Sequence, residues 1–292
     1  MAKNSPTHCH EYEVAINGDR AGLRAMPQLT TYVTWFTLRR TVLSFFQSSY
    51  ENLIERPNGR DWWHSMPLPD GNRIAGAHDD HDLQLKLWEN FYFTTADLVG
   101  KRVLDIGASD GFFTVAAVLA GARRATAINT ADNPTFPENL MFAAKQWNVA
   151  PEVVVDDFRS YPFDSNYDVI FFLGVLYHLE NIFAAVKRLR ELLNDSGTLY
   201  LETQLTLIES SLPIFEAASD IYATTALQNK GALHVTGASN FLFPNEAAIR
   251  NLAYSYDFTC DRLRGPYTRD QPTRGVFRLT KLIEPGPERA VP

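Results

Sequence analysis

The residues with the clearest chemical potential lie in a glycine turn between a predicted strand and a predicted helix. Asp105 lies near the end of the strand Arg102–Ile106, and Gly107 and Gly111 bracket the turn before the helix Phe112–Ala120. Glycine permits a tight turn, and the first turn of a helix presents unpaired N–H groups to a ligand. The spacing of these glycines differs from the G-x-G-x-x-G pattern that binds a pyrophosphate. The turn therefore predicts a ligand site of another kind.

Carboxylates in and beside this turn indicate the charge of the ligand. Asp105 and Asp110 would repel a phosphate and attract an ammonium group or another cation. A ligand with an amino-acid ammonium and a sulfonium fits such a site, so we expect S-adenosylmethionine as the cofactor. A turn with a structural role alone is the alternative interpretation. The predicted cofactor-binding residues of the turn are Asp105, Gly107, Ala108, Ser109 and Gly111.

The ends of the next two predicted strands should complete the cofactor site, because ligands of an open parallel sheet bind beyond the carboxyl ends of its strands. Asn129 stands where a carboxylate normally binds the ribose diol, and an amide would bond a hydroxyl only singly. The nearby Asp132 is the alternative ribose ligand. Asp157 is predicted to accept from the adenine amino group, with Phe158 beside the ring. Asp156 or Asp157 could instead be a solvated strand end.

The fourth predicted strand, Asp168–Leu173, leads into the acceptor side of the site. Leu173 is predicted to contact the cofactor, and Tyr177 and His178 follow in the loop that should face the reacting methyl group. His178 is the candidate general base, because a histidine with a pKa of about 6.5 is largely neutral at pH 7. The alternative is a histidine that hydrogen-bonds locally and shapes the pocket.

Short apolar runs alternate with helical patterns from Lys101 onward. The predicted strands of this region are Arg102–Ile106, Ala125–Ile128, Glu152–Val155, Asp168–Leu173 and Thr198–Glu202. The predicted helices between them are Phe112–Ala120, Pro137–Gln146 and Ile182–Leu193. This alternation predicts right-handed crossovers and a parallel sheet buried on both faces. After an irregular stretch from Glu202 to Asn240, a helix over Asn245–Ser255 and an antiparallel pair, Phe258–Leu263 and Gly275–Leu282, are expected.

The composition narrows the function classes. The chain has 292 residues, with 27 Lys or Arg against 34 Asp or Glu and a formal net charge of −7. An acidic protein repels phosphate backbones, so a nucleic-acid partner is not expected. Cys9 and Cys260 lie too far apart to indicate a small disulfide framework and are expected to be reduced thiols. Since no apolar run of about 18 residues occurs, we expect a cytoplasmic protein without a membrane span.

The region before the glycine turn is expected to be an appendage. Residues 1–94 are predicted to form a helical extension, 95–285 the main domain and 286–292 a tail. Aromatic residues such as Trp35, Trp62 and Trp63 are expected to be core residues, or alternatively a lid that excludes water from the sulfonium. The segment His78–Asp82 has metal-ligand residue types, but a solvated helix start is the favoured interpretation, so no metal is predicted.

Three segments resemble the class I S-adenosylmethionine-dependent methyltransferases: Val103–Phe113, Phe172–Leu179 and Gly197–Thr203. The sequence is more narrowly similar to the branch that contains the bacterial enzyme carboxymethylating the wobble uridine of tRNA. The segments carrying that similarity are Trp63–Gly71 (W-x-H…G), Leu173–His178 (M/L-G-V-L-Y-H) and Phe241–Pro244 (F-x-P). The resemblance covers roughly Trp62 to Leu282. It implies a Rossmann-like α/β fold, with a seven-stranded, mostly parallel sheet whose last strand is antiparallel.

Two departures from that branch favour another acceptor. The family's R-K-G-P-F segment, whose lysine holds an extra carboxylate of the cofactor, corresponds to Arg73–Ala77, which has no lysine. A chain at net −7 also lacks the basic surface that a tRNA ligand requires. We therefore expect methyl transfer to an O, N or S nucleophile of a small molecule, a secondary metabolite or an amino-acid derivative. The alternatives are the tRNA reaction and, because Asn129 replaces the usual carboxylate, a cofactor-binding regulator. A homodimer is compatible with the sequence.

Overall fold

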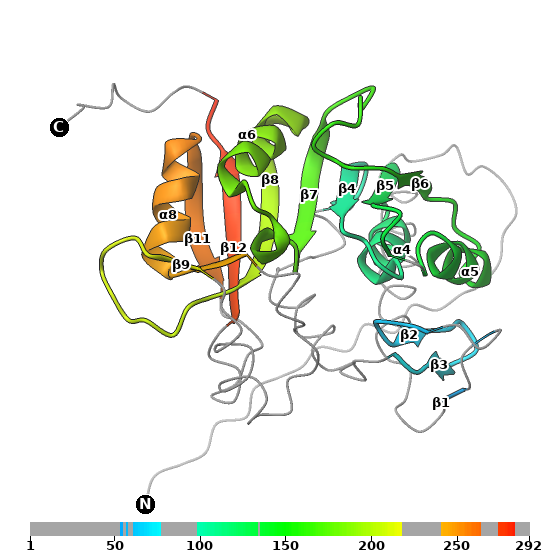
Figure 1. Ribbon diagram of the computed structural model, residues 1–292. Coiled ribbons are helices and arrows are strands. Elements are labelled where there is room, and N and C mark those ends of the chain that lie inside the picture. Colours follow the sequence, from blue (N-terminus) through cyan, green and yellow to red (C-terminus); the bar gives the residue numbers. More distant parts are fainter. Residues whose placement is uncertain are drawn as a thin grey trace, which may run out of the picture.

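A seven-stranded sheet forms the centre of the computed structural model, which describes residues 53–54, 57, 61–76, 98–133, 135–217, 241–263 and 274–283. The strand order is β11-β12-β8-β7-β4-β5-β6 (Figure 1). Its strands are β4 (Arg102–Ile106), β5 (Arg124–Asn129), β6 (Glu152–Val155), β7 (Tyr167–Leu173), β8 (Leu193–Gln204), β11 (Phe258–Leu263) and β12 (Arg274–Lys281). Strands β4 to β8 pair in parallel, and β12 is antiparallel to both β8 and β11. The predicted mostly parallel sheet with an antiparallel last strand is confirmed.

Helices cover both faces of this sheet, as buried parallel strands require. The helices are α4 (Phe112–Leu119), α5 (Glu138–Gln146), α6 (Ile182–Leu192) and α8 (Glu246–Ser255). Val103 and Phe171 pack in a core with α4 and α5, whereas the adjacent Leu104 and Phe172 pack in a second core with α6 and α8. Successive strand residues point to opposite faces, so a continuous apolar run supplies both cores.

Local sequence signals explain most of the element boundaries. Asn181 and Asn245 are the N-caps of α6 and α8, and their side chains accept hydrogen bonds from the backbone N–H groups of Ala184 and Ala248. The predicted helix Asn245–Ser255 therefore starts one residue early. The largest difference concerns the predicted strand Thr198–Glu202, which extends over Leu193–Gln204 because its pairing with β7 begins at Leu193 and its pairing with β12 reaches Gln204.

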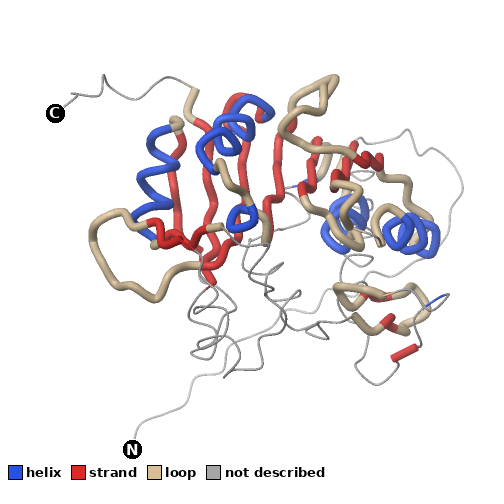
Figure 2. Tube along the Cα trace, in the orientation of Figure 1, coloured by secondary structure: helices blue, strands red, loops and turns tan. Residues whose placement is uncertain are grey.

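Short strands outside the main sheet were not predicted. The strand β3 (Arg73–Ile74) pairs with β2 (Met66–Pro67) and with β1 (Leu53–Ile54). The strand β9 (Phe215–Ala217) pairs with β10 (Leu242–Pro244) beside the start of α8 (Figure 2). The prediction of irregular structure after Glu202 is therefore wrong at β9, which is too short to show a recognisable period.

Several predictions fall on residues that the structure does not describe. The helical pattern predicted from Thr30 to about Ile54 is described only at its end, where it is wrong, because Leu53–Ile54 forms the strand β1 by pairing with β3. The segment His78–Asp82 and the tail 286–292 lie outside the described residues. The proposed domain boundaries remain predictions for the same reason. Within the described residues, no helix is long and apolar enough to cross a membrane, and no group of three acidic, histidine or cysteine side chains could hold a metal ion.

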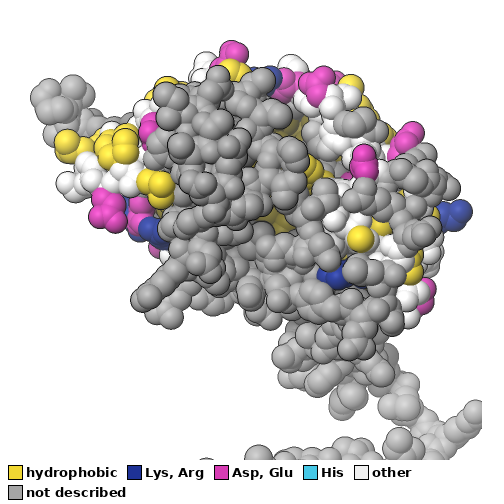
Figure 3. Space-filling model, turned by 60° about the horizontal axis from the view of Figure 1, so that its bottom comes forward, with side chains coloured by type: hydrophobic (Ala, Val, Ile, Leu, Met, Phe, Trp, Pro, Cys, Tyr) yellow, Lys and Arg dark blue, Asp and Glu magenta, His cyan; other side chains and the backbone are white. Residues whose placement is uncertain are grey.

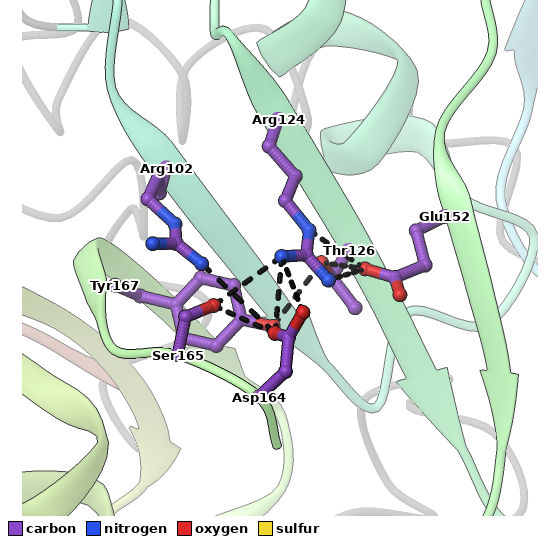
Figure 4. A network of polar contacts seen from close by, with 7 residues as sticks. All are labelled: Arg102, Arg124, Thr126, Glu152, Asp164, Ser165 and Tyr167. Carbon is purple, nitrogen blue, oxygen red and sulfur yellow. Dashed lines mark hydrogen bonds and ion pairs between the residues drawn. The ribbon is translucent and has the colours of Figure 1, made fainter.

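A polar network fixes the amino ends of the parallel strands, at the opposite edge from the glycine turn (Figure 4). The Arg124 guanidinium donates to Glu152 Oε2 at 2.7 and 3.0 Å and to Asp164 Oδ1 at 3.0 Å. The Tyr167 hydroxyl donates to Thr126 Oγ1 at 3.2 Å in the same network. These contacts link β5, β6 and β7, so this edge has a structural role.

Candidate cofactor site and acceptor side

The glycine turn after β4 needs a bare backbone at both ends. Gly107 and Gly111 have φ angles of +74° and +81°, in the left-handed region that favours glycine. A Cβ atom at Gly107 would lie 2.5 Å from Val175 Cγ2, and one at Gly111 would lie 2.1 Å from Leu140 Cδ1. A side chain at either position would strain the backbone and would displace Val175 or Leu140.

Asp105 lies behind this turn in an almost fully buried position, 4% exposed. The Thr114 hydroxyl of α4 donates to Asp105 Oδ2 at 2.6 Å. Burial raises the pKa of Asp105 from its ordinary value of 3.8 to about 7, although the hydrogen bonds from Thr114 act in the opposite direction. A cation close to this carboxyl would favour its charged form.

Asp110 has a different surrounding from the one that the sequence suggests. Its carboxylate is fully buried and accepts hydrogen bonds from the backbone N–H groups of Trp63 and His64, at 2.6 and 2.8 Å. Asn139 Nδ2 donates to the other oxygen at 2.9 Å. The expectation that Asp110 attracts a ligand ammonium is therefore wrong, because these donors surround its carboxylate. The neighbouring Ser109 adopts a positive φ of 49°.

A cavity of about 140 Å³ lies at the carboxyl ends of β4, β5 and β6. Four predicted cofactor residues line it together: Gly107, Asn129, Asp157 and Phe158. The other predicted residues of the turn, Ala108, Ser109 and Gly111, are buried beside it, and Asp132 is exposed outside the lining. Leu173 packs against the core, and Val175 and Leu179 line the cavity instead. These two residues follow β7. The sequence predicted a cofactor contact at the end of this strand but assigned it to Leu173.

The polar groups of the cavity already have protein partners. Asn129 Oδ1 accepts from the Thr130 N–H at 2.9 Å. Asp157 is held by Arg159, whose Nε lies 2.9 Å from both carboxylate oxygens and whose Nη2 lies 2.5 Å from Oδ2. The hydrogen bonds from Arg159 hold the pKa of Asp157 below its usual range. Arg159 was missed, although it stands only two residues beyond Asp157.

The acceptor-side residues lie in a short 3₁₀ helix, Leu176–His178, directly after β7. Tyr177 is 8% exposed, and its hydroxyl accepts from Arg274 Nη1 at 3.3 Å. The Tyr177 and His178 rings lie 4.2 Å apart, and His178 is exposed. The buried Glu202 accepts from Arg274 Nε and Nη2 at 2.5 and 2.7 Å. Sequence reasoning missed this ion pair, although Glu202 ends a predicted strand and Arg274 directly precedes another.

Comparison with known proteins identifies the family. Residues 79–263 match a family described as "Methyltransferase domain". The chain belongs to this methyltransferase family. Because the match spans β4 to β11, it includes the glycine turn, the cavity and the 3₁₀ helix after β7. The predicted identification as a class I methyltransferase is confirmed.

Two curated relatives of the chain are tRNA U34 carboxymethyltransferases. The chain is 31% identical over 162 residues to the tRNA U34 carboxymethyltransferase of Syntrophotalea carbinolica, covering 54% of this chain and 46% of that protein. The tRNA U34 carboxymethyltransferase of Methylococcus capsulatus is 31% identical over 122 residues, covering 40% and 36%. The chain thus spans less than half the length of these curated relatives.

Solved structures with a similar chain trace include two methyltransferases whose names mention a small molecule. Magnesium protoporphyrin IX methyltransferase of Synechocystis PCC 6803, with bound SAH, has a TM-score of 0.48 and 19% identity and covers 68% of this chain and 83% of its own. The 1,6-didemethyltoxoflavin-N1-methyltransferase of Burkholderia thailandensis has a TM-score of 0.47 and 16% identity, covering 75% and 95%.

Membership in the family implies S-adenosylmethionine as the cofactor, and the residues present fit it. Both ends of the turn have positive φ angles that glycine adopts without strain, and Gly107 lines the adjoining cavity. The adjoining cavity offers hydrogen-bonding groups from Asn129 and Asp157 and a flat apolar ring from Phe158. This combination suits a ligand with an amino-acid part, a ribose and an adenine.

Proposed function

We propose that the chain is an S-adenosylmethionine-dependent methyltransferase that acts on an O, N or S nucleophile of a small molecule. The observation that carries the proposal is the position of the cavity. It opens at the carboxyl ends of β4, β5 and β6, directly beside the glycine turn and the residues that follow β7. Ligands of open α/β sheets bind at this edge, so cofactor and acceptor can meet there.

Three residues of the cavity have separate roles in holding the cofactor. Gly107 lines the cavity and presents its backbone to the methionine part, and its positive φ of 74° favours glycine over any other residue. Asn129 bonds a ribose hydroxyl, with the exposed Asp132 as the alternative ligand. Asp157 accepts from the adenine amino group while Arg159 keeps it ionised, since one carboxylate offers lone pairs to both donors.

Residues after β7 act on the acceptor. The bound cofactor supplies a sulfonium-activated methyl group for in-line displacement, so positioning provides most of the acceleration. Tyr177 is held by Arg274, and its ring lies beside that of His178 at a tilt of 51°, which restricts the exposed imidazole on one side. Where the acceptor must lose a proton, His178 accepts it as general base.

The distribution of charge supports a small acceptor over a nucleic acid. Described carboxylates that follow the strand ends and remain at least partly exposed include Asp132, Glu138, Asp156, Asp157, Glu180, Glu209 and Glu216. The two described arginines in these positions, Arg159 and Arg274, are each paired with a carboxylate. Among the described side chains visible on this face, Lys and Arg form no continuous patch (Figure 3). A phosphate backbone would need unneutralised cations here.

Modification of tRNA is the second candidate function. The curated relatives and the Leu173–His178 segment favour it. Against it stands the composition of residues 77–97, which contain four aspartates and one glutamate but only one lysine.

Three measurements test these functions in turn. Calorimetry with S-adenosylhomocysteine should show binding to the full chain, and its absence would remove the methyltransferase proposal. Transfer from labelled S-adenosylmethionine should then label a member of a small-molecule pool. A gel shift with bulk tRNA should show no complex even at low salt. Low salt is the stringent condition, because it favours non-specific as well as specific binding. A tRNA shift together with label in the tRNA would establish the second function instead.

A further inference from the structure

The segment between Asp61 and Gly76 packs onto the same core as the glycine turn. Trp62 is buried and meets Phe142 of α5 edge to face, with ring centroids 6.0 Å apart. Trp147 Nε1 donates to the Pro67 carbonyl oxygen at 2.8 Å. This segment contains β2 and β3 and lies below α4 and α5, on the side where the parallel strands end (Figure 1). It is therefore an integral neighbour of the cofactor site.

Asp110 connects this segment to the turn. Its Oδ2 accepts from two consecutive backbone N–H groups, those of Trp63 and His64. Its Oδ1 accepts from Asn139 Nδ2, which also donates to the Asp61 carbonyl oxygen at 2.8 Å. A buried carboxylate is stable only with such donors, and its hydrogen bonds are stronger than those of neutral groups. One side chain thus joins the segment, α5 and the turn.

Because Asp110 lies within the glycine turn, its contacts restrain the backbone of that turn. Ser109 on one side and Gly111 on the other both have positive φ angles, 49° and 81°. A non-glycine residue keeps such a conformation when the surrounding structure determines it. Gly107, at the other end of the same turn, lines the cavity. Restraint at Asp110 therefore acts on the backbone that the cofactor approaches.

We propose that Asp110 is a positioning residue for the cofactor: its carboxylate holds the amides of Trp63 and His64 and so fixes the glycine turn in its binding geometry. The inference rests on the proposed function. Coupling between two sites is reciprocal, so cofactor binding must protect the docked segment by the same factor by which docking strengthens cofactor binding.

The variant Asp110→Asn tests this coupling, because an amide has one acceptor oxygen where the carboxylate has two. The affinity for S-adenosylhomocysteine is measured by calorimetry, and hydrogen exchange of the Trp63 and His64 amides is measured with and without it. In the wild type the ligand should slow both amides. In Asp110→Asn the dissociation constant should rise about tenfold and the slowing should disappear. The matched control is Asp70→Asn, in the exposed turn of the same segment, where the side chain bonds only Asn72 in the described structure; it should leave both readouts unchanged.

A milder variant covers the case in which Asp110→Asn does not fold. Thr135→Val removes a hydroxyl 3.4 Å from Asp110 Oδ1 and should move both readouts in the same direction by a smaller factor. The inference is overturned if S-adenosylhomocysteine does not change the hydrogen exchange of the two amides in the wild type. It is also overturned if the folded variants keep a dissociation constant within about twofold of wild type while only their thermal stability falls. A wild type that binds no S-adenosylhomocysteine would overturn the proposed function itself.

Discussion

Replacing the buried Asp105 by asparagine should make the protein more stable at neutral pH. Burial raises the pKa of this carboxyl from 3.8 to about 7. Between these values the folded state keeps a proton that the unfolded state has lost, so this group lowers stability as the pH rises through the window. Asparagine has no such proton and keeps an oxygen that can accept from Thr114.

The size of the effect follows from the width of the window. A difference of about three pKa units corresponds to roughly 4 kcal/mol of lost stability above pH 7, and to little near pH 4. The unfolding free energy of Asp105→Asn, minus that of wild type, should therefore grow with pH and level off above about pH 7. This difference isolates Asp105, because every other carboxyl group is common to both proteins.

Urea unfolding followed by tryptophan fluorescence, at intervals from about pH 5 to 8, measures this difference. The control is Asp195→Asn, an exposed carboxylate beside Lys281, for which the difference should stay nearly constant. A constant difference for Asp105→Asn as well, within about 0.5 kcal/mol across the range, would refute the reasoning from burial.

Cofactor binding offers an independent measurement on the same carboxyl. If the ligand ammonium comes close to Asp105, it lowers the raised pKa, and a proton leaves as the ligand binds. Calorimetry near pH 6.5 in two buffers of different ionisation enthalpy should show this release in the wild type and not in Asp105→Asn. Equal release in both proteins would remove Asp105 from the ammonium site while leaving the stability argument intact.

The remaining predictions concern single positions of the site and one thiol. Gly107→Ala should abolish S-adenosylhomocysteine binding in calorimetry, since its Cβ would lie 2.5 Å from a Val175 methyl group; affinity near wild type would place the cofactor elsewhere. Asn129→Asp should bind the cofactor equally or more tightly, because a carboxylate accepts from both ribose hydroxyls, whereas a loss of about tenfold would reveal another role. For a hydroxyl or ammonium acceptor, His178→Ala should lower single-turnover rates by about 10²- to 10⁴-fold and abolish the acidic limb of the pH profile; a retained limb would exclude the general base. Cys260, whose partial burial raises its pKa to about 11, should resist alkylation at neutral pH in peptide mass spectrometry, and rapid labelling would contradict the raised pKa.

Much of the fold was predictable because its signals are local. The strands Arg102–Ile106, Glu152–Val155 and Phe258–Leu263 agree with the predicted ranges, and β-branched and apolar residues between turns specify the first two. Asn181 and Asn245 start their helices through side-chain caps that need only the next three residues. The extension of β8 was not predictable, because partners on two different strands create it.

The site divides in the same way. Residues that lie at a strand end or in a turn, such as Gly107, Asn129 and Asp157, could be assigned to the cavity because the topology of a parallel sheet brings these ends together. Side-chain pairs between residues far apart in the sequence could not be assigned. Glu202 and Arg274 stand 72 residues apart, and their pairing exists only because β12 is inserted beside β8.

Asp110 shows most clearly what the sequence by itself determined and what only the tertiary structure decided. The sequence determined the glycine turn, the parallel sheet and the cofactor class, because glycine geometry, hydrophobic period and the alternation of strands with helices depend on near neighbours. It also placed a carboxylate in the turn, but the direction of that carboxylate was open. The tertiary structure turned it toward backbone amides 46 and 47 residues away, since burying a charge requires donors and the docked segment presents two together.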